Sequence, residues 1–210
     1  MAGRMIDLSV PCGKDTPGFT VALQGGLPVY CGHECRAYDL SILSHHGTYF
    51  ETSSHLFRDG RDTADVPLDR LIVPGVRLDV RGCGRRIAAA DLERIAGDAP
   101  LPRGCGLLLR ASAPPGEAHR YFSRDAAQWM ADRRVALMGS DTPLYDSGFE
   151  NPTGFFIDLF RAEIPIVANI VNLDLLPRDG FTLIVLPLSI AGVCTVPCRV
   201  VAALGGLPTP

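Results

Sequence analysis

Hydrophobic and polar residues alternate in several short segments of the chain, and this pattern predicts strands. In the clearest of these, residues 36–44, Tyr38, Leu40 and Ile42 face one way while Asp39 and Ser41 face the other. We expect this strand to be half buried and to lead the chain into residues 44–55. Alternating or continuous apolar runs predict further strands at residues 5–10, 76–80, 106–110, 135–138, 164–168, 181–186 and 199–203.

Helix signals are fewer than strand signals. Residues 91–96 form a short helix that Gly97 should end, Ser123 is a favourable N-cap for a helix through Arg133, and a third helix is expected near residues 155–162. Frequent glycine and proline predict a loop through Pro28. The fold class expected is therefore α/β with a mixed sheet, and 210 residues suit one domain over residues 1–210.

Composition narrows the choice of partner. The chain is 47% hydrophobic and 20% charged, as in ordinary globular proteins, and its net charge is −3. This charge offers neither a basic surface for nucleic acid nor a polybasic patch for membranes. No apolar run is long enough to span a bilayer, and the first ten residues lack the apolar core of a signal peptide. We therefore expect a cytoplasmic protein that acts on a small molecule.

The seven cysteines are odd in number and scattered, which indicates reduced thiols rather than a disulfide framework. Two pairs lie close in sequence, Cys31 with Cys35 and Cys194 with Cys198, but neither has the C-x-x-C spacing of a structural zinc site. We expect buried or loop thiols. Catalysis by a thiol stays open, although no cysteine has a base beside it in the sequence.

The densest polar stretch is residues 44–55, S-H-H-G-T-Y-F-E-T-S-S-H, which contains three of the five histidines. If the chain is extended here, one face carries His45, Tyr49, Glu51, Ser53 and His55. If the first part coils, His45 and Tyr49 still meet at i,i+4 spacing. Imidazole, carboxylate and phenol on one face supply a proton acceptor, an orienting partner and a proton donor. We interpret this stretch as a catalytic site; the alternative is a set of hydrogen-bonded core groups under a loop.

The same stretch resembles the signature of the metal-dependent cyclase superfamily, H-x-G-T-H-x-D-x-P-x-H, which includes bacterial kynurenine formamidases and isatin hydrolases. The positions that match are His45, Gly47, Thr48 and His55. The departures are Tyr49 for the second histidine, Glu51 for the aspartate and Ser53 for the proline. The resemblance runs along most of the chain, and it implies a swivelling β/α/β domain around a mixed sheet, assembled as a homodimer or homotetramer.

The departures fall on metal ligands. In the family, two metal ions are held by the first two histidines and the aspartate of the signature, with a later histidine and glutamate. By this resemblance the later ligands fall on Phe156 and Ala168, which cannot bind a metal. Only His45 is unchanged, with Glu51 as a longer carboxylate, and two donors are fewer than such sites need. We therefore expect no metal cofactor, with a single weakly bound ion, helped by His33 or His46, as the alternative.

The resemblance also assigns roles. His55 falls on the family's catalytic histidine, and we expect it to act as general acid/base. Glu51 would orient an imidazole or act as the base, Tyr49 would stabilise an oxyanion, and His45 would be a second proton shuttle or a substrate partner. The expected substrate-binding residues are Thr48, Ser53, Phe156 and Asp141. Phe156 favours an aromatic or polyketide-like substrate, or else fills the core, and Asp141 has a turn-capping role as its alternative.

These roles predict a metal-independent acid/base enzyme that carries out cyclisation, dehydration, isomerisation or opening of an activated lactone. A composition rich in Ala, Arg, Gly, Pro and Asp resembles that of high-GC bacteria and suggests secondary metabolism. One alternative is a metal-dependent amide or lactone hydrolase of the kynurenine formamidase or isatin hydrolase kind, with a single divalent ion. The other is a non-catalytic ligand-binding pseudoenzyme. Metal analysis separates the first two, and substitution of His55 tests the third.

Overall fold

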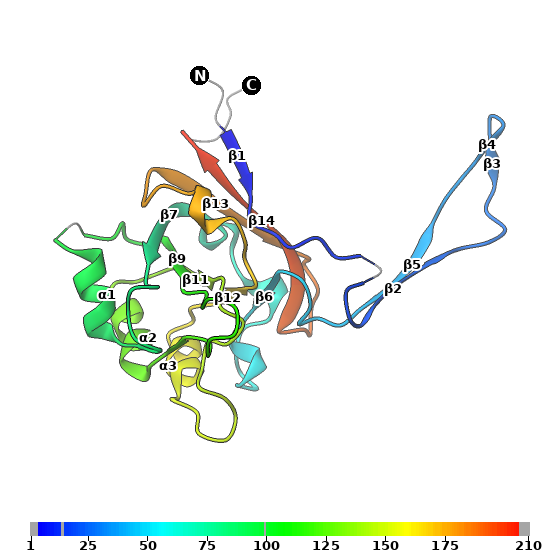
Figure 1. The fold of residues 1–210 in the computed structure, drawn as a ribbon. Coiled ribbons are helices and arrows are strands. Elements are labelled where there is room, and N and C mark those ends of the chain that lie inside the picture. The colour runs from blue at the N-terminus through cyan, green and yellow to red at the C-terminus, as the bar shows by residue number, and fades with distance from the viewer. Residues whose placement is uncertain (1–3, 14, 99, 206–210) are drawn as a thin grey trace.

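A large sheet that closes on itself forms the body of the protein in the computed structural model, which describes residues 4–13, 15–98 and 100–205 (Figure 1). The strand order is β1-β14-β13-β7-β9-β11-β12-β6, and β6 also pairs with β14. The strands are β1 (Arg4–Asp7), β6 (Tyr49–Glu51), β7 (Ile72–Asp79), β9 (Gly106–Arg110), β11 (Leu137–Ser140), β12 (Ile166–Ala168), β13 (Phe181–Pro187) and β14 (Thr195–Leu204).

Strand directions are mixed, as expected. The pairs β7–β9, β9–β11 and β11–β12 are parallel. Every pair in this sheet that includes β1, β6, β13 or β14 is antiparallel. Parallel neighbours need crossover connections, and helices supply them: α2 (Arg124–Asp132) lies between β9 and β11, and α3 (Phe155–Arg161) between β11 and β12. The third helix, α1 (Ala89–Ala96), follows β7. This architecture confirms the α/β fold class.

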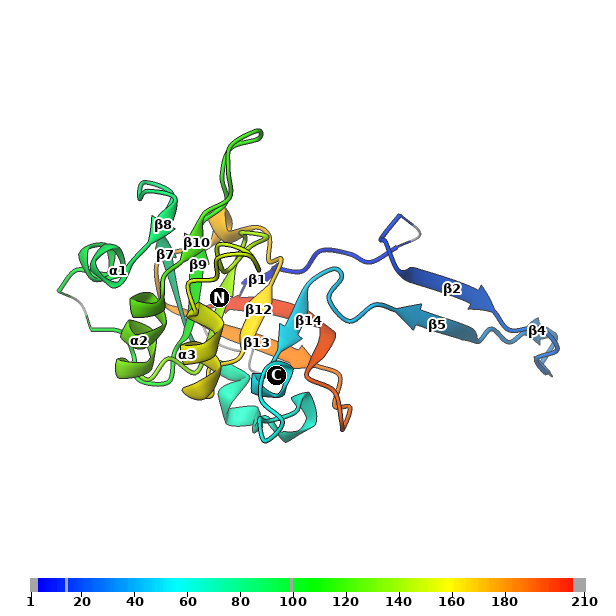
Figure 2. The ribbon, with the colours of Figure 1, turned by 90° about the horizontal axis from the view of Figure 1, so that it is seen from below.

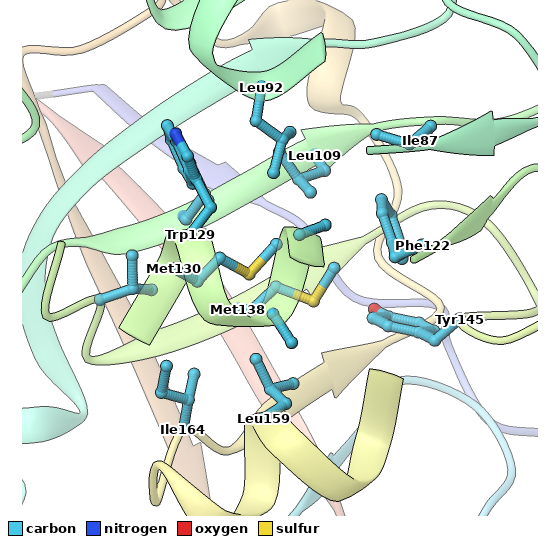
Figure 3. Packing of buried hydrophobic residues seen from close by; sticks show 14 of the residues in the cluster. Ile87, Leu92, Leu109, Phe122, Trp129, Met130, Met138, Tyr145, Leu159 and Ile164 are labelled. Carbon is cyan, nitrogen blue, oxygen red and sulfur yellow. The ribbon is translucent and has the colours of Figure 1, made fainter. Parts of the chain in front are cut away.

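Two hydrophobic clusters cover the two faces of the sheet. The first, called the inner cluster, includes Phe50, Leu183 and Val200 and fills the inside of the closed sheet. The second, called the outer cluster, lies between the sheet and the helices, where Trp129 of α2 and Leu159 of α3 pack toward strand residues (Figure 3). The helices therefore screen only the outer face of the parallel strands, and this same outer face continues onto β6.

Most predicted elements are present with shifted ends. Residues 106–110 form β9 with the expected bounds, and Gly97 ends α1 with a φ of 64°. Shorter elements that were not predicted are β3 (Val29–Tyr30), β4 (His33–Glu34), β8 (Arg86–Ile87), β10 (Tyr121–Phe122) and the 3-10 helices Ser53–His55, Thr63–Asp65, Leu68–Arg70 and Leu173–Leu175. A single domain over residues 1–210 stays a prediction.

Two expectations near the N-terminus are wrong. The Gly- and Pro-rich segment expected to be a loop contains β2 (Phe19–Leu23), which pairs with β5 (Tyr38–Ile42). β5 alternates as predicted, but it is not half buried: Tyr38 is 50% and Leu40 is 66% exposed. The reason is that β2 and β5 form a separate two-stranded sheet that projects from the body (Figure 2). No helix within the described residues is long and apolar enough to cross a membrane.

Candidate functional site

Strand β6 is part of the closed sheet and contains the central residues of the candidate site. Its edges are paired on both sides, with β12 and with the start of β14, so that Glu51 lies opposite both Ile166 and Thr195. Because side chains alternate along a strand, Phe50 enters the inner cluster while Tyr49 and Glu51 share the outer face. Of the two alternatives for this stretch, the one in which its first part coils is closer: residues 44–48 form a turn, only residues 49–51 are extended, and residues 53–55 form a 3-10 helix.

Turns on either side of β6 bring two histidines back to Glu51. The Nδ1 atom of His55 lies 3.0 Å from Glu51 Oε1, and the Nε2 atom of His45 lies 3.7 Å from the same oxygen. The centroids of the two imidazole rings are 5.3 Å apart. The Glu51 side chain is 5% exposed, whereas those of His45 and His55 are 39% and 38% exposed. These three residues form the His–Glu–His cluster, which is anchored on a buried carboxylate and open toward solvent.

The turn before β6 depends on Gly47. Its φ is +65°, and a Cβ atom at this position would lie 2.4 Å from Cys12 Sγ. The Gly47 carbonyl accepts a hydrogen bond from the Asn169 side chain at 2.9 Å. The hydroxyl of Thr48 donates to the Asn169 carbonyl at 2.8 Å and accepts from the backbone N–H of Val10 at 2.8 Å. Thr48 therefore serves to hold the turn, and its role in substrate binding stays a prediction.

Electrostatics fix two protonation states in the metal-free cluster. The hydrogen bond with Glu51 is the largest cause that raises the pKa of His55 to about 9, against an opposing effect of burial. Burial, followed by the negative charge of Glu51, raises the pKa of Tyr49 to about 12. At neutral pH, Tyr49 is therefore a hydrogen-bond donor. The rings of Tyr49 and His45 lie close, with centroids 5.2 Å apart, as the i,i+4 spacing predicted.

A cysteine that the sequence did not assign to the site also reaches His55. The Sγ atom of Cys194 lies 3.7 Å from His55 Nδ1. The hydroxyl of Thr195 lies 3.4 Å from this sulfur and 3.5 Å from His45 Nε2. Cys194 and His55 are 139 positions apart, and they meet only because β14 pairs with β6. No local sequence signal could have joined them.

The remaining predicted substrate residues make structural contacts. The hydroxyl of Ser53 donates to Glu163 at 2.9 Å and accepts from the Arg61 backbone at 2.8 Å. Asp141 accepts hydrogen bonds from two backbone N–H groups, those of residues 111 and 112, at 2.6 and 2.9 Å, which agrees with its capping alternative. The Phe156 ring stacks on Tyr145 with centroids 6.1 Å apart, at the edge of the outer cluster. Their roles in binding stay predictions.

The His–Glu–His cluster is also a suitable donor set for a divalent ion. One ligand atom from each of His45, Glu51 and His55 lies within 4.8 Å of the other two. In a tetrahedral zinc site with bonds of about 2.0–2.1 Å, donor atoms lie roughly 3.4 Å apart. The observed 3.0 and 3.7 Å bracket that separation. Two imidazoles and a carboxylate are ordinary zinc ligands, so the residues present fit such an ion.

The sequence model of the cyclase family, described as "Putative cyclase", matches residues 6–147. This chain belongs to the cyclase family. Kynurenine formamidases from Bacillus anthracis and Salinibacter ruber are 27% and 28% identical to it, over 77% and 81% of this chain and 77% and 80% of theirs. The structure of isatin hydrolase A from Labrenzia aggregata, bound to benzyl benzoate, superposes with a TM-score of 0.80 at 19% identity, covering 97% of this chain and 94% of that one.

These similarities confirm the resemblance drawn from the signature. The chain belongs to the cyclase/formamidase-like superfamily, and the isatin hydrolase superposition confirms its fold. At two positions where the resemblance expects metal ligands, this chain carries residues that differ from them. Tyr49 and Ala168 face each other across the β6–β12 pair, where the resemblance expects two ligands.

Proposed function

We propose that this cyclase-family protein hydrolyses an amide or lactone in a small molecule and works with a single divalent ion held by the His–Glu–His cluster. The observation that carries the proposal is the convergence of donor atoms from His45, Glu51 and His55 within 4.8 Å of one another. The family's metal-ligand positions retain two donors in this chain, His45 and Glu51. His55 adds a third donor. Three protein ligands with one side open to solvent are typical of catalytic zinc sites.

Only one ion is proposed, since the family's other ligand positions carry Tyr49, Phe156 and Ala168. A phenol binds metals weakly at neutral pH, and the phenyl and methyl groups offer no donor atom. The chemistry that such an ion supplies is Lewis acidity toward the substrate carbonyl and a lower pKa for a water molecule.

The chain's own groups complete the proposed site. The buried Glu51 carboxylate lies 3.0 Å from His55 Nδ1, within hydrogen-bond distance, and 3.7 Å from His45 Nε2, which is beyond that distance. The Tyr49 hydroxyl stays protonated, since its pKa is raised to about 12, and can donate a hydrogen bond to the oxygen on which negative charge develops. An aromatic substrate is proposed because kynurenine and isatin, in the names of the relatives, carry aromatic rings. Phe156, which is half buried near the outer cluster, would contact that ring.

A second candidate is the metal-independent acid/base enzyme, favoured by the hydrogen bond between His55 and Glu51. That bond raises the pKa of His55 to about 9, so the metal-free imidazole is protonated at neutral pH and can act as a general acid. His45, at 39% exposure, would accept a proton from the substrate. These two groups and Tyr49 suffice for cyclisation, dehydration, isomerisation or opening of an activated lactone, the reactions proposed for secondary metabolism.

All seven cysteines carry free thiols, which supports a cytoplasmic location.

Metal analysis and turnover of one preparation test both candidates. The full chain is purified without added metal, dialysed, and analysed for metal content before and after exposure to zinc or manganese. Each sample is then assayed with isatin and an aryl formamide. Glu51→Gln removes the shared ligand and is expected to weaken ion binding at least about 100-fold. Tyr49→Phe is the matched control: it lies on the same strand face, and we expect it to bind the ion normally.

The outcomes separate the candidates. One ion per chain that Glu51→Gln loses, with turnover that returns on adding metal, supports the single-ion hydrolase. Turnover by fully metal-free protein that chelators leave unchanged overturns it in favour of acid/base catalysis. Substrate binding without turnover in either form, unaffected by His55→Ala, overturns both in favour of a ligand-binding pseudoenzyme.

A further inference from the structure

Glu163 has a backbone conformation that favours glycine. It follows Ala162, the C-cap of α3, and its φ is +54°. The N–H groups of Glu163 and Ile164 donate to the carbonyls of Phe160 and Leu159 at 3.0 and 3.1 Å, which is the Schellman end of a helix. Glycine is the usual residue at this position, because a side chain in the left-handed region is strained. The glutamate therefore points to a role for its side chain.

The Glu163 carboxylate contacts the 3-10 helix that carries His55. Its Oε1 atom accepts a hydrogen bond from the Ser53 hydroxyl at 2.9 Å, and its Oε2 atom lies 3.5 Å from Arg61 Nε. The Ser53 hydroxyl also accepts a hydrogen bond from the Arg61 backbone N–H at 2.8 Å. Ser53 is 2% exposed, and the cavity lined by these three residues measures only about 10 Å³. The Ser53 hydroxyl thus uses its donor and an acceptor position inside the protein.

The 3-10 helix is too short to hold itself firmly. It spans only Ser53–His55, its N-cap Thr52 makes no side-chain hydrogen bond to it, and the hydrogen bonds of 3-10 helices have poor geometry. This single turn nevertheless sets the position of His55, because it folds the chain so that His55 Nδ1 lies 3.0 Å from Glu51 Oε1. A contact that holds Ser53 from outside the turn therefore affects the His–Glu–His cluster.

Glu163 is itself held in place next to β12. The Arg70 guanidinium donates hydrogen bonds to the carbonyls of Glu163 and Ala136 at 2.6 and 2.9 Å. Three residues after Glu163, Ile166 of β12 lies opposite Glu51 of β6. Glu163 therefore joins two parts of the site: its backbone leads into the strand beside Glu51, and its side chain binds the turn that carries His55.

We propose that Glu163 is a positioning residue, which acts through Ser53 to hold the 3-10 helix so that His55 faces Glu51. This role explains why a strained glutamate persists at a position where glycine would fit without strain. For the bound ion, the role rests on the proposed single-ion function. For the metal-free protein, it rests on the hydrogen bond between His55 and Glu51 alone.

Glu163→Gly tests this role, because it removes the carboxylate and the backbone strain together. The matched control is Arg134→Gly. Arg134 follows α2 in the same way: its φ is also +54°, its N–H and that of Val135 close a Schellman end, and its side chain is exposed. Two further variants examine the contact itself. Glu163→Gln keeps an oxygen that can accept from Ser53, and Ser53→Ala removes the hydroxyl.

Two measurements on the full-length chain report the position of His55. In metal-free protein, NMR gives the nitrogen chemical shifts of the His55 ring, which differ between an imidazole held by a carboxylate and a free one. With zinc added, competition with a chelating dye gives the dissociation constant of the ion. For Glu163→Gly and Ser53→Ala we expect shifts closer to those of free imidazole and a dissociation constant raised about 10–100-fold. Glu163→Gln and Arg134→Gly should resemble the wild type, and the thermal midpoint of Glu163→Gly should not fall.

Three results overturn the proposal. Unchanged His55 shifts in Glu163→Gly show that the turn holds itself. Equal changes in Glu163→Gly and Arg134→Gly show a general effect of altered helix ends. A Glu163→Gln variant as defective as Glu163→Gly shows that the charge of Glu163 acts without Ser53. A wild type that binds no ion contradicts the proposed hydrolase but not this role, because the nitrogen shifts are measured in metal-free protein.

Discussion

Strands β5 and β6 are separated by six residues, yet their surroundings are opposite. β6 is paired on both edges, and its Phe50 is fully buried inside the closed sheet. β5 has one partner, and its Leu40 is 66% exposed. Both strands contain large apolar residues, so the difference lies in what surrounds them. Alternation in a sequence thus predicts a strand and its two faces, but not whether either face is covered.

Phe50→Ala in β6 should have the largest effect on stability. Removal of a fully buried ring leaves a cavity inside the closed sheet, and we expect a loss of about 3–5 kcal/mol in the free energy of unfolding. Urea denaturation followed by circular dichroism measures it. A loss below about 1 kcal/mol would mean that β6 is as loosely held as β5.

Tyr49→Phe, one residue away on the opposite face of β6, should act on catalysis instead. Loss of the hydroxyl removes a donor to the developing oxyanion, and we expect kcat/KM to fall about 100-fold, or ~2.7 kcal/mol. Unfolding measured in parallel should change little, because the ring is kept. Unchanged kcat/KM would exclude this hydroxyl from the chemistry.

Gly47→Ala tests the turn between the two strands. The added Cβ atom would lie 2.4 Å from Cys12 Sγ in a residue whose φ is +65°, and we expect a cost of about 1–3 kcal/mol. Gly25→Ala, in the projecting segment between β2 and β5, is a matched control because nothing lies within 4 Å of its added Cβ. Thermal denaturation of the two variants should differ clearly, and equal midpoints would contradict the assigned turn.

Titration of His55 gives a smaller effect. In metal-free protein its pKa should be about 9, and Glu51→Gln should move it toward the ordinary 6.5. A raised folded-state pKa stabilises the fold fully below about pH 6.5, and this contribution is lost as the pH rises through about 9. The stability change is small, because the side chain is 38% exposed and screened by water. NMR of the imidazole protons measures the pKa, and a value near 6.5 in the wild type would rule out the pairing.

Leu40→Ala in β5 should have the smallest effect. At protein concentrations low enough to keep the chain monomeric, removal of this exposed side chain should change the free energy of unfolding by less than about 0.5 kcal/mol. The same urea titration used for Phe50→Ala measures it. A larger loss in the monomer would show that the projecting two-stranded sheet folds back onto the body.

Local patterns in the sequence predicted the fold class and much of the site. The continuous apolar run at residues 106–110 and the glycine at 97 fixed β9 and the end of α1, and the dense polar stretch contained the His–Glu–His cluster. Contacts between residues far apart in the sequence could not be predicted from these local patterns. Cys194 meets His55 across 139 positions, and His55 returns to Glu51 through a 3-10 turn rather than along a strand. Residues 19–23 were expected to be part of a loop because glycine and proline residues surround them. Their pairing with β5 outweighs these turn signals and makes them strand β2.

The closure of the sheet by β14 also sets the order in which the site can be assembled during synthesis. One edge of β14 is shared by β6, at residues 195–197, and by β1, at residues 201–204. Thr195, which lies opposite Glu51, is therefore made more than 140 positions after the residue whose strand it completes. A nascent chain that has not yet released β14 has β6 held on one edge only. The candidate site around Glu51 is thus complete only after residue 197 has been made, and until then one edge of β6 stays unpaired.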